Sequence, residues 1–78
     1  MFEQLKALIS NYVEVNADEI TGESRFIDDL GFNSYDFMSF LGDIETELGV
    51  TVDENEVVNL HTVGDAVDYL EILAGKGE

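Results

Sequence analysis

Residues 26–50 read FIDDLGFNSYDFMSFLGDIETELGV and contain the clearest helix signal of the chain. Asn33 is a good N-cap, and Asp36 gives a spacing similar to a capping box with acidic charge in the first turn. Gly49 can end the helix, because glycine tolerates the left-handed conformation at a helix C-terminus. The pattern predicts a helix over residues 34–48 whose apolar side carries Phe37, Phe40, Leu41, Ile44 and Leu48.

A second apolar period precedes this stretch and predicts a first helix. Its residues recur three and four positions apart, at Phe2, Leu5, Leu8, Ile9, Tyr12 and Val13. The connection over residues 15–33 is long for a compact domain, and loops of this length are usually packed or functional. We expect it to be pinned across the helices by its apolar residues Ile20, Phe26, Ile27 and Leu30.

Two further helices are expected after Gly49. Residues 53–60, DENEVVNL, predict one or two helical turns with Val57 and Leu60 inward. The last helix opens at Thr62 with Asp65 in capping-box spacing, ends at Gly75, and buries Val63, Ala66, Val67, Leu70 and Leu73. No long stretch of the sequence alternates apolar and polar residues with the period of two that is typical of a β-strand, so strands are not expected. The sequence predicts one all-α domain over residues 1–78, a four-helix bundle of three main helices and a short third one.

Composition narrows the class of partner. The chain has 78 residues, with three basic against 18 acidic side chains and a net charge of -15. Such a surface repels nucleic acid phosphates and anionic lipid heads, and it attracts basic protein surfaces. The start MFEQLKALIS lacks the features of a signal peptide, and no apolar run approaches the ~20 residues that span a bilayer. We expect a cytoplasmic monomer that does not insert into membranes.

Ser34 is the candidate for chemistry. It stands exposed at the start of the predicted helix, after a turn that contains Gly31. Free backbone N–H groups and the positive end of the helix dipole favour a phosphate there. No basic neighbour in sequence can activate the hydroxyl, so another enzyme must attach any group. By itself, however, a serine at a helix start is commonplace.

The same stretch resembles the core of the acyl carrier proteins. That family has an apolar residue, two acids, Leu-Gly and then Asp-Ser-Leu opening its second helix, and the positions matched here are Phe26, Asp28, Asp29, Leu30, Gly31 and Ser34. The end of the chain, with Thr62-Val63 and then residues 66–70, is similar to the family's final helix. The resemblance covers nearly the whole chain.

The resemblance implies a function without catalysis. Ser34 would accept 4'-phosphopantetheine from coenzyme A through a phosphopantetheinyl transferase, and the terminal thiol would carry acyl groups as thioesters in fatty acid or polyketide-type synthesis. The transferase and the acyl-loading and chain-elongating enzymes would dock basic surfaces on the second helix, where Asp36, Asp43 and Glu47 share a narrow arc. The apolar pocket of the family would be lined here by Phe26, Met38, Ile44, Leu60 and Ala66, which are also ordinary core positions.

Departures from the family pattern leave alternatives open. Asn33 and Tyr35 replace the usual Asp and Leu, and Ser39 and Gly42 stand where an acid and a larger apolar residue are common. A stand-alone aminoacyl or peptidyl carrier of a specialised pathway is one alternative. Another is an acidic interaction module that is never modified.

Two other classes fit poorly. An EF-hand loop counted from Asp53 places Val57 and Val58 at a ligand position and at the glycine position, so no calcium site is expected. His61 is the sole candidate general base for an enzyme, and no nucleophile-elbow signature surrounds Ser34.

Overall fold

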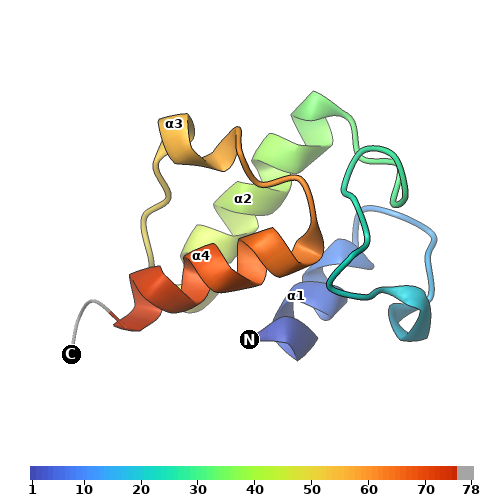
Figure 1. The fold of residues 1–78 in the computed structure, drawn as a ribbon, viewed down its shortest axis with the longest axis horizontal. Helices are drawn as coiled ribbons and strands as arrows, with labels where there is room; N and C mark the ends of the chain where they lie inside the picture. The colour runs from blue at the N-terminus through green and yellow to red at the C-terminus, as the bar shows by residue number, and fades with distance from the viewer. Residues whose placement is uncertain (76–78) are drawn as a thin grey trace.

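The structure is a computed structural model that describes residues 1–75. Its elements are the helices α1 (Phe2–Ile9), α2 (Ser34–Leu48), α3 (Glu54–Val57) and α4 (Val63–Gly75), with the short 3-10 helix η1 (Ala17–Glu19) in the first loop (Figure 1). In this part of the chain the β-type pairing is one isolated antiparallel bridge between Arg25 and Thr62. The predicted all-α class, with three main helices and a short third one, is confirmed.

Local signals place both ends of α2. The Asn33 side chain accepts a hydrogen bond from the Asp36 amide over 2.7 Å, which satisfies one of the free donors of the first turn. At the other end Gly49 takes φ +66°, and its amide donates to the Glu45 carbonyl. Both cap predictions are confirmed.

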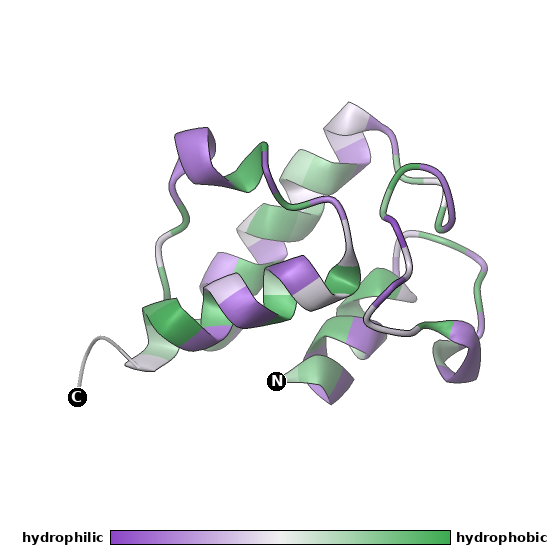
Figure 2. Ribbon diagram, in the orientation of Figure 1, coloured by the Kyte–Doolittle hydropathy of each residue, from purple (hydrophilic) through white to green (hydrophobic). Residues whose placement is uncertain are grey.

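The core joins the helices to the long loop. Buried apolar residues come from all four helices and from residues 20–32; they are Leu5, Ile9, Ile20, Phe26, Leu30, Phe32, Phe40, Leu41, Ile44, Val57, Val63, Ala66 and Leu70. Hydrophobic and hydrophilic residues alternate along α4 in Figure 2, as expected for a helix with one buried side. Across the described helices, none is long and apolar enough to cross a membrane.

The loop prediction was correct for three anchors and wrong for Ile27. Ile20, Phe26 and Leu30 are buried, but the Ile27 side chain is 56% exposed. Phe32, which the sequence did not single out, is buried in its place. Gly31 takes φ +82° and lets the chain fold back, so that the Phe32 amide donates to the Phe26 carbonyl and the two rings lie 5.6 Å apart. This reversal turns Ile27 outward.

The first helix is shorter than its apolar period suggested. It ends at Ile9, and the chain continues in turns in which the Tyr12 and Val13 amides both donate to the Ile9 carbonyl. Tyr12 nevertheless packs on the core, with its ring centroid 5.9 Å from that of Phe32. The apolar positions beyond Ile9 therefore reach the core from a turn and not from a continued helix.

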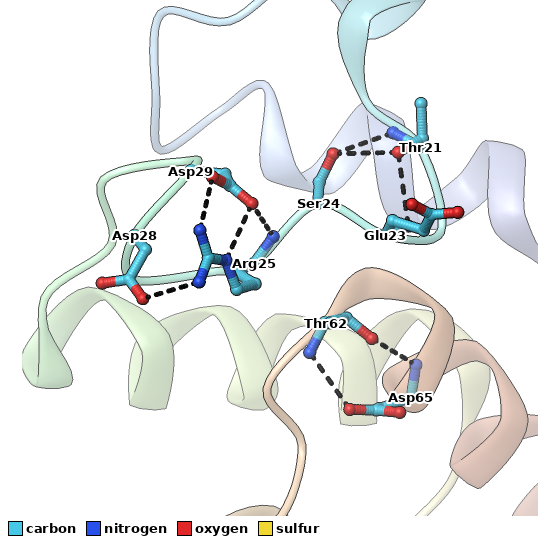
Figure 3. A network of polar contacts seen from close by, with 8 residues as sticks. All are labelled: Thr21, Glu23, Ser24, Arg25, Asp28, Asp29, Thr62 and Asp65. Atoms are coloured by element: carbon cyan, nitrogen blue, oxygen red, sulfur yellow. Dashed lines mark hydrogen bonds and ion pairs between the residues drawn. The ribbon is translucent and has the colours of Figure 1, made fainter.

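The loop crosses the start of α4 at very short range. The Gly64 amide donates to the Gly22 carbonyl over 2.8 Å, and the Val63 amide donates to the Ser24 carbonyl over 2.9 Å. Next to this crossing, Thr62 and Asp65 form the predicted capping box, each side chain accepting from the other's amide (Figure 3). The crossing fixes the loop against the first turn of α4.

Candidate functional site

Ser34 is the first residue of α2, and its side chain is exposed. The cap at Asn33 occupies the Asp36 amide with its side chain and the Phe37 amide with its carbonyl. The amides of Ser34 and Tyr35 have no acceptor within residues 1–75. A hydroxyl thus stands beside two free N–H donors at the positive end of a helix, an arrangement that suits an attached anion.

A largely apolar hollow opens beside this hydroxyl. We call it the Ser34 hollow; it measures about 420 Å³ and is lined by Ile27, Ser34, Phe37, Met38, Val57, Val58, Leu60 and His61. An adjoining Arg25 hollow of about 210 Å³ shares Ile27, Phe37, Leu60 and His61 and adds Arg25, Phe26 and Asp28. The loop, the first turn of α2 and the segment from α3 to α4 therefore meet at one place.

The structure distributes the five predicted pocket residues over three environments. Met38 and Leu60 line the Ser34 hollow, and Phe26 lines the Arg25 hollow. Ile44 and Ala66 are 0% and 1% exposed and line neither hollow, because they point into the helix core. Assignment of the five residues to an acyl pocket stays a prediction.

Sequence reasoning missed five residues that line the Ser34 hollow. Ile27, Phe37 and Val57 were expected to pack inward, Val58 was not singled out, and His61 was considered only as a base for catalysis. The exposure of Ile27 and Val58 follows from tertiary structure, because no local pattern distinguishes an exposed Val58 from the buried Val57 beside it. The excess of apolar residues around the Ser34 motif was the one available signal.

The acidic arc on α2 is present but not uniform. Asp43 and Glu47 are exposed, and Asp36 is partly exposed. The Tyr12 hydroxyl donates a hydrogen bond to the Asp43 carboxylate, which ties the turn after α1 to α2. This bond, together with burial, raises the pKa of Tyr12 to about 12. Asp43 is thus both a surface charge and a structural acceptor.

A second set of charges fixes the loop near Ser34. Arg25 contacts Asp29 through its Nε at 3.2 Å and Asp28 through a terminal nitrogen at 3.4 Å (Figure 3). The Asp29 carboxylate also accepts from the Arg25 amide over 2.8 Å. These contacts to Arg25 hold the pKa of Asp29 below its usual range. The two acids of the Asp28-Asp29 pair therefore fold the loop around Arg25.

The site suits covalent attachment better than catalysis. The Ser34 hydroxyl can form an ester, the free amides can donate hydrogen bonds to an anionic phosphate oxygen, and the hollow can shelter an apolar group. In residues 1–75 the Ser34 hydroxyl has no hydrogen bond to His61 or another base, and no group of three acidic or histidine side chains could hold a metal ion.

Comparisons with known proteins agree with this geometry. Residues 3–70 match the family model described as the phosphopantetheine attachment site. The chain is 43% identical over 70 residues to the acyl carrier protein of Clostridium perfringens strain SM101, covering 90% of this chain and 92% of that protein. It is 39% identical over 75 residues to the acyl carrier protein of Thermotoga maritima, covering 96% and 93%.

A solved structure of the acyl carrier protein from Enterococcus faecalis matches with a TM-score of 0.81 and 30% identity, over 92% of this chain and 91% of that one. The fold, the attachment motif and nearly the full length therefore agree. The chain belongs to the acyl carrier protein family: it is a non-catalytic carrier domain that works with a phosphopantetheine arm.

Proposed function

We propose that Ser34 is the attachment point of 4'-phosphopantetheine and that the arm carries acyl intermediates of fatty acid or related polyketide-type synthesis in the cytoplasm. The observation that carries the proposal is the exposed Ser34 hydroxyl at the start of α2, which lines the apolar hollow of about 420 Å³. When bound, the arm supplies a terminal thiol that holds an acyl group as a thioester.

Residues of the chain position this arm in two ways. The free amides of Ser34 and Tyr35 face the phosphate end, where the helix dipole favours negative charge. Met38 and Leu60 offer apolar surface within the same hollow. Ile44 and Ala66 could meet an acyl chain only if α2 and α4 separate, because both are fully enclosed in the core.

Partner enzymes are proposed to dock on the acidic arc of Asp36, Asp43 and Glu47. Family membership implies a phosphopantetheinyl transferase and acyl-processing enzymes as partners. With a net charge of -15, the chain attracts basic protein surfaces, and charges at the rim of an interface act mainly on the association rate. The arc lies on the helix that begins with Ser34, so a docked enzyme would be held close to the hydroxyl.

The attachment is tested by intact-mass analysis after incubation with coenzyme A and a broad-specificity transferase. Wild type should gain the mass of one phosphopantetheine, and Ser34→Ala should gain none. Ser39→Ala is the matched control, because it removes a second hydroxyl of the same helix and should be modified like wild type. Continued modification of Ser34→Ala, or no modification of wild type by several transferases, would contradict the proposal.

A further inference from the structure

The few cationic side chains of the chain are unevenly placed. Among the described residues, the groups that can carry positive side-chain charge are Lys6, Arg25 and His61. Two of them, Arg25 and His61, line the connected hollows beside Ser34. Lys6 lies on α1, paired with Glu3 at 3.0 Å and stacked over the Phe2 ring. In so acidic a protein, this placement points to a negatively charged group at the hollows.

Arg25 and His61 differ in what they can still bind. Arg25 is held by Asp28 and Asp29, so two carboxylates already balance its charge. The exposed His61 ring has no hydrogen bond or ion pair to residues 1–75. His61 is therefore the cationic side chain of the hollows that remains available to a ligand.

The backbone of His61 is fixed from three directions. Its carbonyl accepts from the Phe26 amide over 3.0 Å, and its amide donates to the Asp65 carboxylate over 3.2 Å. The adjacent Thr62 pairs with Arg25 in the isolated bridge. These contacts hold the ring at the wall shared by the two hollows, where it lines the same hollow as Ser34.

We propose that His61 is a binding residue for the phosphodiester of the arm on Ser34. This inference rests on the attachment proposed above. A phosphodiester on the Ser34 hydroxyl is anionic, and the imidazolium form of His61 would donate a charge-assisted hydrogen bond to it across the hollow. The free amides of Ser34 and Tyr35 would bind the same group from the helix side. This contact would hold the base of the arm at the hollow.

Other charged groups also face His61 and can contribute to the electrostatic environment of the phosphodiester. Arg25 and Asp28 face it from the loop, and Asp65 contacts its amide from α4. The side chains that α2 and α3 contribute to the shared hollow are Ser34, Phe37, Met38 and Val57, none of which titrates near neutral pH. His61 is the one histidine of the chain. A pH-dependent shift of the phosphorus resonance that disappears when this side chain is replaced can therefore be assigned to His61.

The test is phosphorus NMR of the arm-loaded protein, with loading verified by mass, between about pH 5 and 8, where histidine titrates. In wild type the phosphodiester resonance should shift sigmoidally with pH, and ring protons of His61 should show cross-peaks to the first methylene of the arm. In His61→Gln the sigmoidal shift should disappear and only the drift caused by carboxylates should remain. Lys6→Gln, which removes a distant cation, should keep the wild-type curve.

Superimposable curves for wild type and His61→Gln would overturn the inference. Cross-peaks from the ring to distal parts of the arm alone would also overturn it, since the contact would then not involve the phosphodiester. Equal thermal midpoints of the two proteins are expected, so a lost shift cannot be attributed to unfolding. Protein that never accepts the arm would refute the attachment at Ser34 and this inference together, whereas a loaded protein with identical curves would refute the inference alone.

Discussion

Alanine at Gly42 and at Gly64 should change stability in opposite directions, although both glycines lie in helices. At Gly42, in the middle of α2, an added Cβ would meet no atom within 4 Å. Alanine is favoured over glycine in a helix interior by about 0.8–1.0 kcal/mol. Gly42→Ala should therefore raise the free energy of unfolding by roughly this amount, which corresponds to about 4–8 °C in the melting midpoint of a domain of this size.

At Gly64 the loop crossing reverses the sign. A Cβ there would lie 2.9 Å from the Gly22 carbonyl oxygen and 3.5 Å from the Gly22 carbonyl carbon and Cα. These are backbone atoms, so the loop must move away from α4 and lengthen the 2.8 Å hydrogen bond between the Gly64 amide and Gly22. Overpacking of this kind typically costs about 1–3 kcal/mol. Since the helix gain is smaller than this at the first turn, Gly64→Ala should be destabilised by roughly 1–3 kcal/mol.

The assay is urea unfolding followed by far-ultraviolet circular dichroism, with both variants at the same salt and pH. If the free energy of unfolding falls with urea at a similar slope in each protein and only the urea midpoint differs, the substitutions changed stability and not the compactness of the unfolded state. If Gly64→Ala gains as much stability as Gly42→Ala, the loop is not held against α4 at Gly22, and the close approach is not a feature of the folded protein. If Gly42→Ala is destabilised, the face of α2 that carries Gly42 is not open to solvent.

Four further outcomes are expected. The thermal midpoint should rise with sodium chloride, and further with millimolar magnesium, because the Debye length falls from about 10 Å at 0.1 M salt to about 3 Å at 1 M, so that repulsion between the acidic side chains is screened. A flat midpoint would show that charge repulsion is negligible. Reversal of Asp36 and Asp43 to Lys should slow modification of Ser34 without changing the helical circular dichroism, and an unchanged rate would place enzyme docking elsewhere. Asn33→Asp should keep the cap, since the two residues cap equally well, and should speed transfer of the arm in a magnesium-dependent way, as initial rates would show. Folding raises the Tyr12 pKa from 10.0 to about 12, so the neutral hydroxyl stabilises the fold below about pH 10, and this stabilisation is lost as the pH rises through 12. Tyr12→Phe should therefore make the free energy of unfolding less dependent on pH in the alkaline range.

Much of the fold follows from local signals in the sequence. The start of α2 at Ser34 depends on the Asn33 cap, and its end depends on the left-handed conformation of Gly49. The start of α4 depends on the capping box of Thr62 and Asp65. Each feature involves residues within one helical turn, so short-range hydrogen bonding determines it. The position of Ser34 at a helix start followed from the same signals.

Tertiary structure decided which side chains of the loop are buried and which residues line the hollows. Phe32 is buried and Ile27 is exposed because the turn at Gly31 folds Phe32 back onto Phe26. His61 reaches the Ser34 hollow because its carbonyl pairs with Phe26 across a separation of 35 positions in the chain. Hydrophobicity alone does not say which apolar residue of an irregular segment turns inward, since no helical period fixes the direction of its side chains. That choice depends on which surface the folded loop meets.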